Sequence, residues 1–158
     1  MKYFKKQNGF SLVELLIVIL VIVLLATISA MAINSQKAKA RDAKRISDIR
    51  QIQTALEFYK SDEGEFPVVA EPIIIGQDVV KLCGKAEGGF VSSQTECKEA
   101  STHMSVVPTD PLSDRFYSYS GSAETFDLSF TTERPSVLGP AGTYYAHPNL
   151  TDNTPSAN

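Results

Sequence analysis

The chain opens with one long apolar run, and only later do polar and apolar residues mix. From Phe10 to Ile33 a single charged side chain, Glu14, interrupts 24 residues. As a helix this run would be about 36 Å long, enough to cross a hydrocarbon core of about 30 Å with some tilt. Its Leu, Ile and Val side chains leave no polar face for water, which makes a helix buried in a protein core the weaker interpretation.

A different periodicity follows the apolar run. Apolar side chains recur every three or four residues over about two heptads, which predicts one apolar stripe on a charged helix. These side chains are Ile46, Ile49, Ile52, Leu56 and Tyr59. Gly64 and Pro67 then end the pattern. We expect the stripe to cover a sheet; a coiled-coil seam is the alternative, and the shortness of the pattern weakens it.

Two alternating segments predict an antiparallel hairpin further along the chain. Residues 116–120 and 125–130 alternate apolar and polar positions, and Gly121 to Glu124 would form the turn between them. Segments 70–105 and 134–158 show no firm pattern. Residues 151–158 contain no apolar side chain larger than Ala, so we expect a flexible tail there.

Charge is distributed unevenly over the 158 residues. Residues 1–50 carry nine Lys or Arg against three acids, whereas residues 51–158 carry six against fifteen, and the formal net charge is −3. This asymmetry predicts a basic, membrane-proximal stalk and an acidic head, and it argues against nucleic acid binding by the head. A chain of this length, partly committed to an apolar run, has little room for a large enzyme core.

No pattern for catalysis or for a cofactor is present. The sequence lacks a Gly-rich phosphate loop, a paired metal-ligand motif and a nucleophile elbow. Asp110, Asp114 and Asp127 could collect around a cation, but solvated turn residues are the simpler interpretation. We therefore expect a protein that is not an enzyme, with no catalytic residues, no metal and no cofactor.

The two cysteines, Cys83 and Cys97, favour one disulfide. Closing this 15-residue loop would stabilise the fold by about 3 kcal/mol, and the bond persists only in an oxidising compartment. Two free thiols or half of a zinc site are the alternatives. The zinc interpretation lacks further ligands, because His103 and His147 are isolated in the sequence.

Glu14 is the most informative residue of the apolar run. Placing an ionisable group this near a bilayer core costs free energy, so its presence indicates either a binding partner or a function. Four residues beyond Phe10, its carboxylate could instead reach the lipid headgroups by snorkelling, and position alone does not separate these interpretations. The basic residues on the two sides of the run would place the C-terminal side in the cytoplasm, whereas the disulfide predicts the opposite.

The segment from Lys5 to Leu16, Lys-Lys-Gln-Asn-Gly-Phe-Ser-Leu-Val-Glu-Leu-Leu, resembles the class III leader and helix start of type IV pilins and type II secretion pseudopilins. The resemblance implies that prepilin peptidase cleaves between Gly9 and Phe10 in the cytoplasm and methylates the new amino group of Phe10. It also implies that Glu14 offsets the amino terminus of a neighbouring subunit during assembly, and that the head lies outside the cytoplasm.

An ordinary secretory signal peptide is the alternative to this leader. Three lysines precede the apolar run, and Ala30-Met31-Ala32 has the small-x-small pattern of a cleavage site. The apolar region would be longer than usual, however, and would contain Glu14 near its start. We therefore prefer the prepilin-type leader.

The resemblance extends beyond the leader, with two departures. The segment from Arg41 through Phe66-Pro67 is similar to the exposed half of a pilin helix, and residues 107–111 and 116–130 are similar to the loop and strands of pilin heads. In many relatives a proline bends the apolar half of the helix. In this sequence Met31 lies near the position of that proline. Major pseudopilins often follow the second strand with an Asp-rich calcium loop, whereas residues 131–135 are Thr-Thr-Glu-Arg-Pro, which favours a pilus subunit over a pseudopilin.

These observations together predict an α+β fold. Residues 1–9 would be the leader. One long helix ending near Ser61 would follow, with residues 10–33 as its transmembrane or filament-core half and residues 34–61 as its amphipathic half. Residues 62–150 would form a β-sheet head, and residues 151–158 the tail.

The expected function is structural: a membrane-anchored precursor polymerises into a surface filament. The resemblance implies as partners further copies of the chain, prepilin peptidase, a membrane platform protein and an assembly ATPase. A type II secretion pseudopilin or a membrane-tethered binding module are the alternatives.

Overall fold

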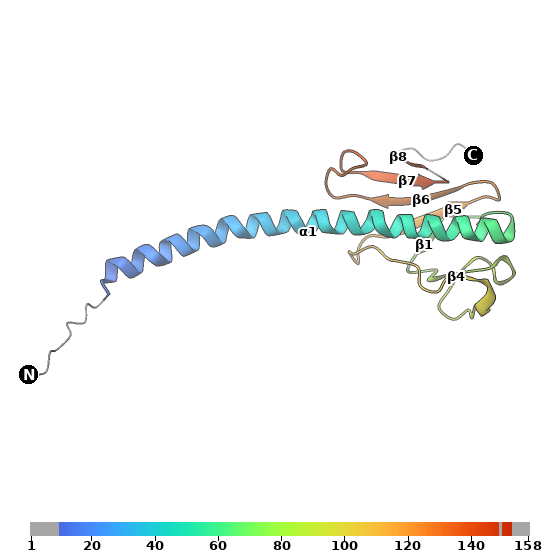
Figure 1. Ribbon diagram of the computed structural model, residues 1–158, viewed down its shortest axis with the longest axis horizontal. Coiled ribbons are helices and arrows are strands. Elements are labelled where there is room, and N and C mark those ends of the chain that lie inside the picture. The colour runs from blue at the N-terminus through green and yellow to red at the C-terminus, as the bar shows by residue number, and fades with distance from the viewer. Residues whose placement is uncertain (1–9, 149, 153–158) are drawn as a thin grey trace, which may run out of the picture. The chain divides into compact units, whose positions relative to one another are not determined.

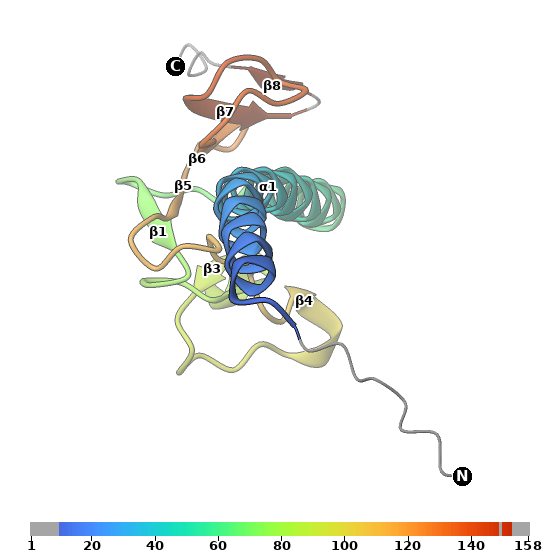
Figure 2. The same cartoon turned by 90° about the vertical axis from the view of Figure 1, so that its left-hand side faces the viewer.

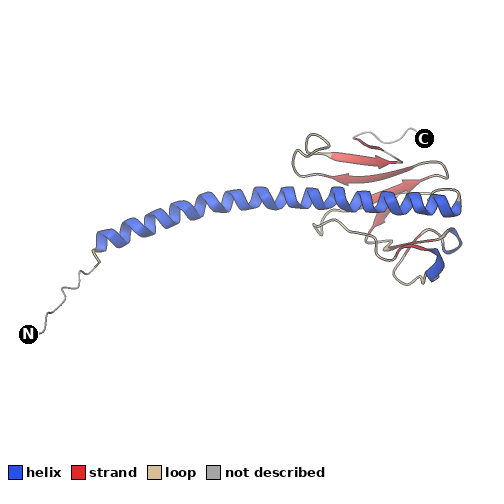
Figure 3. Ribbon diagram, viewed as in Figure 1, coloured by secondary structure: helices blue, strands red, loops and turns tan. Residues whose placement is uncertain are grey.

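The computed structural model describes residues 10–148 and 150–152. Helix α1 (Leu12–Glu63) comes first, followed by antiparallel strands, which confirms the α+β prediction (Figures 1 and 3). The strands are β1 (Ile73–Ile75), β2 (Lys81–Cys83), β3 (Phe90–Val91), β4 (Thr102–Met104), β5 (Tyr117–Gly121), β6 (Phe126–Thr131), β7 (Thr143–His147) and β8 (Leu150–Asp152). Short 3-10 helices occupy Lys85–Glu87 and Glu99–Ser101. Contacts divide the chain into one unit that runs to Lys37 and a head unit that begins at Ala38, and α1 passes through both.

Both ends of α1 have identifiable causes. The carbonyl of Ser11 accepts a hydrogen bond from the amide of Leu15 at 3.2 Å, which makes Ser11 the N-cap, a position that favours serine. At the other end Gly64 has a φ of +85°, and its amide donates to the carbonyl of Lys60 at 2.9 Å. A left-handed glycine directly after a helix is a common stop signal, so the helix ends at Glu63, two residues beyond the expected Ser61.

The main sheet has five antiparallel strands in the order β1-β5-β6-β7-β8. The predicted hairpin is present as β5 and β6, where Tyr119 faces Leu128. In β6, Phe126, Leu128 and Phe130 are buried and the residues between them are partly exposed, as the period of two requires. The sheet also extends into the segment expected to be a tail, because β8 pairs Thr151 with Ala146 of β7.

The core of the head lies between α1 and this sheet. Four side chains of the predicted stripe, Ile49, Ile52, Leu56 and Tyr59, are almost fully buried with strand residues such as Tyr117 and Leu128. Ile46 packs at the margin of the same core. Figures 1 and 2 place β6–β8 and β4 on different sides of the second half of α1. The stripe therefore covers a sheet, as expected, rather than a coiled-coil partner.

A smaller sheet lies within segment 70–105, which shows no firm sequence pattern. Its order is β3-β2-β4, and its strands have only two or three residues each. The disulfide between Cys83 and Cys97 is present, with 5.4 Å between the Cα atoms. Cys83 is fully buried in β2, so the bond ties the loop after β3 to the head.

Reduction of this disulfide should destabilise the head. A bond that closes a loop of this length contributes about 3 kcal/mol to the free energy of unfolding, chiefly by restricting the unfolded chain. Denaturant unfolding of the detergent-solubilised protein with and without reductant measures this difference in one sequence. An unchanged midpoint, with both thiols shown by alkylation to be free, would contradict the expectation.

Candidate functional site

The apolar half of α1 is the first candidate site. From Leu12 to Leu25 the large apolar side chains are 45–79% exposed, and the segment is long and apolar enough to cross a membrane. So much exposed apolar surface needs lipid or a protein partner. Glu14 lies in the first turn of the helix, is exposed, and has no ion pair among the described residues.

Ser11 and Glu14 also fit a local pattern. Serine at the N-cap followed three residues later by glutamate is the sequence of a capping box, in which the carboxylate turns back to the backbone of the N-cap. Helix capping is therefore a second interpretation of Glu14, beside pairing with a neighbouring subunit.

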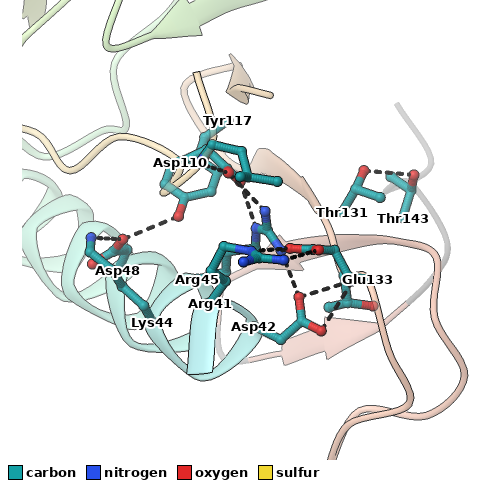
Figure 4. A network of polar contacts seen from close by, with 12 residues as sticks. Arg41, Asp42, Lys44, Arg45, Asp48, Asp110, Tyr117, Thr131, Glu133 and Thr143 are labelled. Carbon is teal, nitrogen blue, oxygen red and sulfur yellow. Dashed lines mark hydrogen bonds and ion pairs between the residues drawn. The ribbon is translucent and has the colours of Figure 1, made fainter. Parts of the chain in front are cut away.

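A buried ionic cluster in the head is the second candidate site (Figure 4). Arg41, Asp42 and Arg45 occupy one turn of α1, where spacings of three and four residues put side chains on one face. Asp110 comes from the loop before β5, and Glu133 follows β6. The cluster thus joins three segments that are far apart in the sequence.

Arg45 is the centre of this cluster. Its side chain is fully buried, and its Nε and Nη2 atoms donate to the two carboxylate oxygens of Asp110 at 2.7 and 2.8 Å. Its Nη1 atom donates to Asp42 and to Glu133, both at 2.7 Å. Burial alone lowers the pKa of the Arg45 guanidinium, but the hydrogen bonds to the three carboxylates outweigh it and raise the pKa. One buried guanidinium therefore donates hydrogen bonds to three carboxylates, and Arg41 adds a second positive charge to the cluster.

Asp42 and Glu133 attach the loop after β6 to the helix. The Asp42 carboxylate accepts hydrogen bonds from the backbone amides of Glu133 and Arg134, each at 2.9 Å. Glu133 accepts from Nε of Arg41 at 2.8 Å and also from Arg45. The hydrogen bond from Arg41 is the largest cause that lowers the pKa of Glu133, from 4.5 to about 2. Both acids thus hold the loop to the helix.

Tyr117 links the core to the same face of α1. Its hydroxyl donates to Asp48 at 3.1 Å, and Asp48 also accepts from Lys44 at 2.7 Å. Burial raises the pKa of the Tyr117 hydroxyl, with the Asp48 charge as a further cause, so the phenol remains a donor at physiological pH. The first turns of the head helix are therefore fixed by directed polar contacts as well as by the apolar core.

Comparisons with known proteins identify the N-terminal segment. A family model for the prokaryotic N-terminal methylation motif matches residues 4–30. The chain is similar to type II secretion system core protein G of Vibrio cholerae, with 26% identity over 90% of this chain and 91% of that protein. The chain thus carries the N-terminal methylation motif and is similar to type II secretion pseudopilins.

Further relatives of this pilin-like chain carry the same name. The core protein G of Escherichia coli is 39% identical over 39% of this chain and 43% of its own length. That of Pseudomonas aeruginosa is 26% identical over 78% of this chain and 82% of its own length. The more identical matches therefore span less than half of each relative. No solved structure matches the chain significantly.

The sequence-predicted site residues fall into separate places in this pilin-like chain. Gly9 lies outside the described residues, and Phe10 is exposed two residues before α1 begins. Glu14 lies on the helix itself, while Cys83 and Cys97 are bonded in the head. Cleavage, methylation and the pairing of Glu14 stay predictions, since they depend on groups outside a single folded chain.

The acids considered as cation ligands do not converge. Asp110 binds Arg45, and Asp127 lies 2.7 Å from Nδ1 of His147. In residues 10–148 and 150–152, no three His, Cys, Asp or Glu side chains are arranged to hold a metal ion. The cation next to Asp110 is the guanidinium of Arg45, which comes from α1.

Sequence reasoning missed the ionic cluster. It treated Arg41, Asp42 and Arg45 as part of an exposed, charged helix, and Asp110 as a turn residue. Two arginines four residues apart, with an aspartate between them on the same face, were a usable signal, because such a group can gather acids from other segments.

Acid should weaken the cluster through Glu133. The folded-state pKa of about 2 lies below the ordinary 4.5. This pairing therefore contributes stability above about pH 4.5, and the contribution is lost as the pH falls toward 2. We expect Glu133→Gln to be less stable than the wild type at neutral pH and the two unfolding free energies to converge in acid. A difference that stays constant down to about pH 3 would refute this assignment.

Proposed function

We propose that the chain is a precursor subunit of a filament of the type II secretion pseudopilus class, cleaved after Gly9 and assembled through the apolar half of α1. The observation that carries the proposal is the match of residues 4–30 to the methylation motif, on a helix whose apolar side chains from Leu12 to Leu25 are 45–79% exposed. In the membrane, lipid covers this surface; in a filament, the same helices of other copies replace the lipid.

The processing step gives Glu14 a partner. Cleavage between Gly9 and Phe10 creates an amino group four residues before the carboxylate in the chain. Two opposite charges in a dry filament core offset each other's desolvation only when they are paired. A carboxylate of one copy next to the amino terminus of another therefore fixes the relative position of the two helices.

The head has a role distinct from that of the apolar segment. Because the ionic cluster attaches two loops to α1, the head and the second half of the helix behave as one body. We propose a structural role without catalysis, with the head outside the cytoplasm and with prepilin peptidase, a platform protein and an assembly ATPase as partners.

A pilus subunit is the second candidate. The names of the relatives favour the pseudopilus. The segment after β6 favours the pilus, because it contains Glu133 bound to arginines in place of the carboxylate-rich calcium loop common in major pseudopilins. The two candidates share processing and helix packing and differ in filament length and cargo.

Deletion of the gene in the source organism tests the proposal. For a pseudopilin we expect folded exoproteins to accumulate inside the cell envelope, with complementation by the wild-type chain. For a pilus subunit we expect normal secretion and loss of long surface filaments in negative-stain images. Normal secretion together with unchanged filaments would contradict both candidates.

A further inference from the structure

The charges of the head unit are separated along α1. Residues 38–50 contain five Lys or Arg against two Asp, whereas residues 57–65 contain one Lys against four Asp or Glu. About 36 Å of helix separates Lys39 from Glu63, at 1.5 Å per residue. The loops follow the same polarity. Arg134 is bonded to Asp42 at the basic end, and Glu124 is bonded to Lys60 at the acidic end.

Several of these charges remain free on the surface. Lys39 and Arg134 are exposed at the basic end and form no ion pair within the described part of the chain. Glu124 is exposed at the acidic end and is equally unpaired among those residues. The Asp62 side chain is 70% exposed, with only a 3.8 Å contact to His103. Both ends thus present unneutralised charge to solvent.

The stability of the helix does not explain this arrangement. The C-terminal turn of a helix favours cations, because unpaired carbonyls give it a partial negative charge. Asp62 and Glu63 lie in this turn and are unfavourable there. Glu63 accepts a hydrogen bond from the backbone amide of Lys85 at 3.1 Å, whereas the exposed Asp62 is left for an interaction outside the chain.

We propose that the basic end of one head docks on the acidic end of the head of a second copy, an inference that rests on the proposed filament function. Lys39 and Arg134 of one copy would face Asp62 and Glu124 of the next. Such a contact joins two different surfaces of the same chain, so it can repeat from copy to copy, and it builds an open fibre when the rotation between copies does not close a ring. Complementary potentials also orient incoming subunits and reject the reversed orientation.

Cysteine crosslinking tests the contact directly. The two native cysteines are bonded to each other, so an introduced cysteine is the only free thiol in each chain. We expect Lys39→Cys and Asp62→Cys subunits, co-expressed and mildly oxidised in sheared filaments, to form crosslinked dimers. In the control, Gln51→Cys replaces Lys39→Cys; Gln51 is exposed in the middle of the head helix. This mixture should form no crosslinked dimers. Equal crosslinking in both mixtures, or none in either, would overturn the contact.

Charge reversal supplies an independent measurement. Lys39→Glu with Arg134→Glu should lower the yield of sheared filament about tenfold, and adding Asp62→Lys with Glu124→Lys in the same chain should restore it. Gln51→Glu is the matched control and should retain full yield. If the basic end instead binds anionic lipid, the two Glu substitutions lower the amount of membrane-bound precursor, and the two added Lys substitutions do not restore it. That result would overturn the proposal. If the wild-type chain forms no filament, both the proposed function and this contact are wrong. If the wild-type chain forms filaments and charge reversal does not change their yield, only the contact is wrong.

Discussion

Replacing Arg45 by methionine should lower the free energy of unfolding of the head by about 3 to 5 kcal/mol. The substitution keeps most of the side-chain volume and removes the charge, so Asp42 and Asp110 remain buried without their cation, while Glu133 keeps its contact with Arg41. Asp110 is the most affected, because its side chain is only 1% exposed and both oxygens are bound to Arg45. The measurement is denaturant unfolding of the full chain in detergent, followed by the near-ultraviolet circular dichroism of the tyrosines in the head.

Two further variants separate the ionic cluster from general packing. Arg50→Met makes the same chemical change on an exposed part of the same helix and should alter stability by no more than about 0.5 kcal/mol. Adding Asp110→Asn to Arg45→Met should recover part of the loss, since one unpaired buried charge disappears. A loss for Arg45→Met as small as that for Arg50→Met would show that the cluster contributes little.

Replacing Glu14 by valine should leave membrane insertion intact and lower filament assembly more than a hundredfold. Removing a charge eases burial in lipid, so the precursor should reach the membrane and be processed. In the filament the amino terminus of Phe10 would lack its partner, at a cost of about 3 to 5 kcal/mol by analogy with broken buried pairs. At a factor of ten for each 1.4 kcal/mol, that cost accounts for the expected loss.

Glu14→Gln distinguishes this pairing from helix capping. Glutamine retains the capping box with Ser11 but has no charge. Pairing predicts that both Glu14 variants fail in assembly and that Ser11→Ala assembles nearly normally. Capping alone predicts that Glu14→Gln behaves as the wild type and that Ser11→Ala is impaired. Each variant should be expressed as the only copy, with membrane-bound and sheared protein measured separately.

The helix, its apolar stripe and the β5–β6 hairpin could be predicted because their signals are local. Ile49, Ile52 and Leu56 repeat at the period of a helix, and Phe126, Leu128 and Phe130 at the period of a strand. The β2–β4 sheet could not be predicted, because strands of two or three residues are too short to show alternation. There the sequence indicated only the disulfide, through the isolation of its two cysteines.

The ionic cluster was missed for a different reason. Arg45 binds partners 65 and 88 residues further along the chain, and neither partner lies in a recognisable motif. A charged helix residue is usually solvated, so burial of this one depends on which loops return to the helix. The end of the sheet was misjudged in the same way, since Thr151 joins β8 only through pairing with β7.

On the proposed function, the chain becomes a filament subunit once its leader has been removed after Gly9. Intact mass spectrometry of the protein recovered from sheared filaments or from the membrane tests it most directly. We expect one species that begins at N-methylated Phe10 and contains the Cys83–Cys97 bond. A mature chain that retains residues 1–9, or one that begins after Ala32, would contradict it.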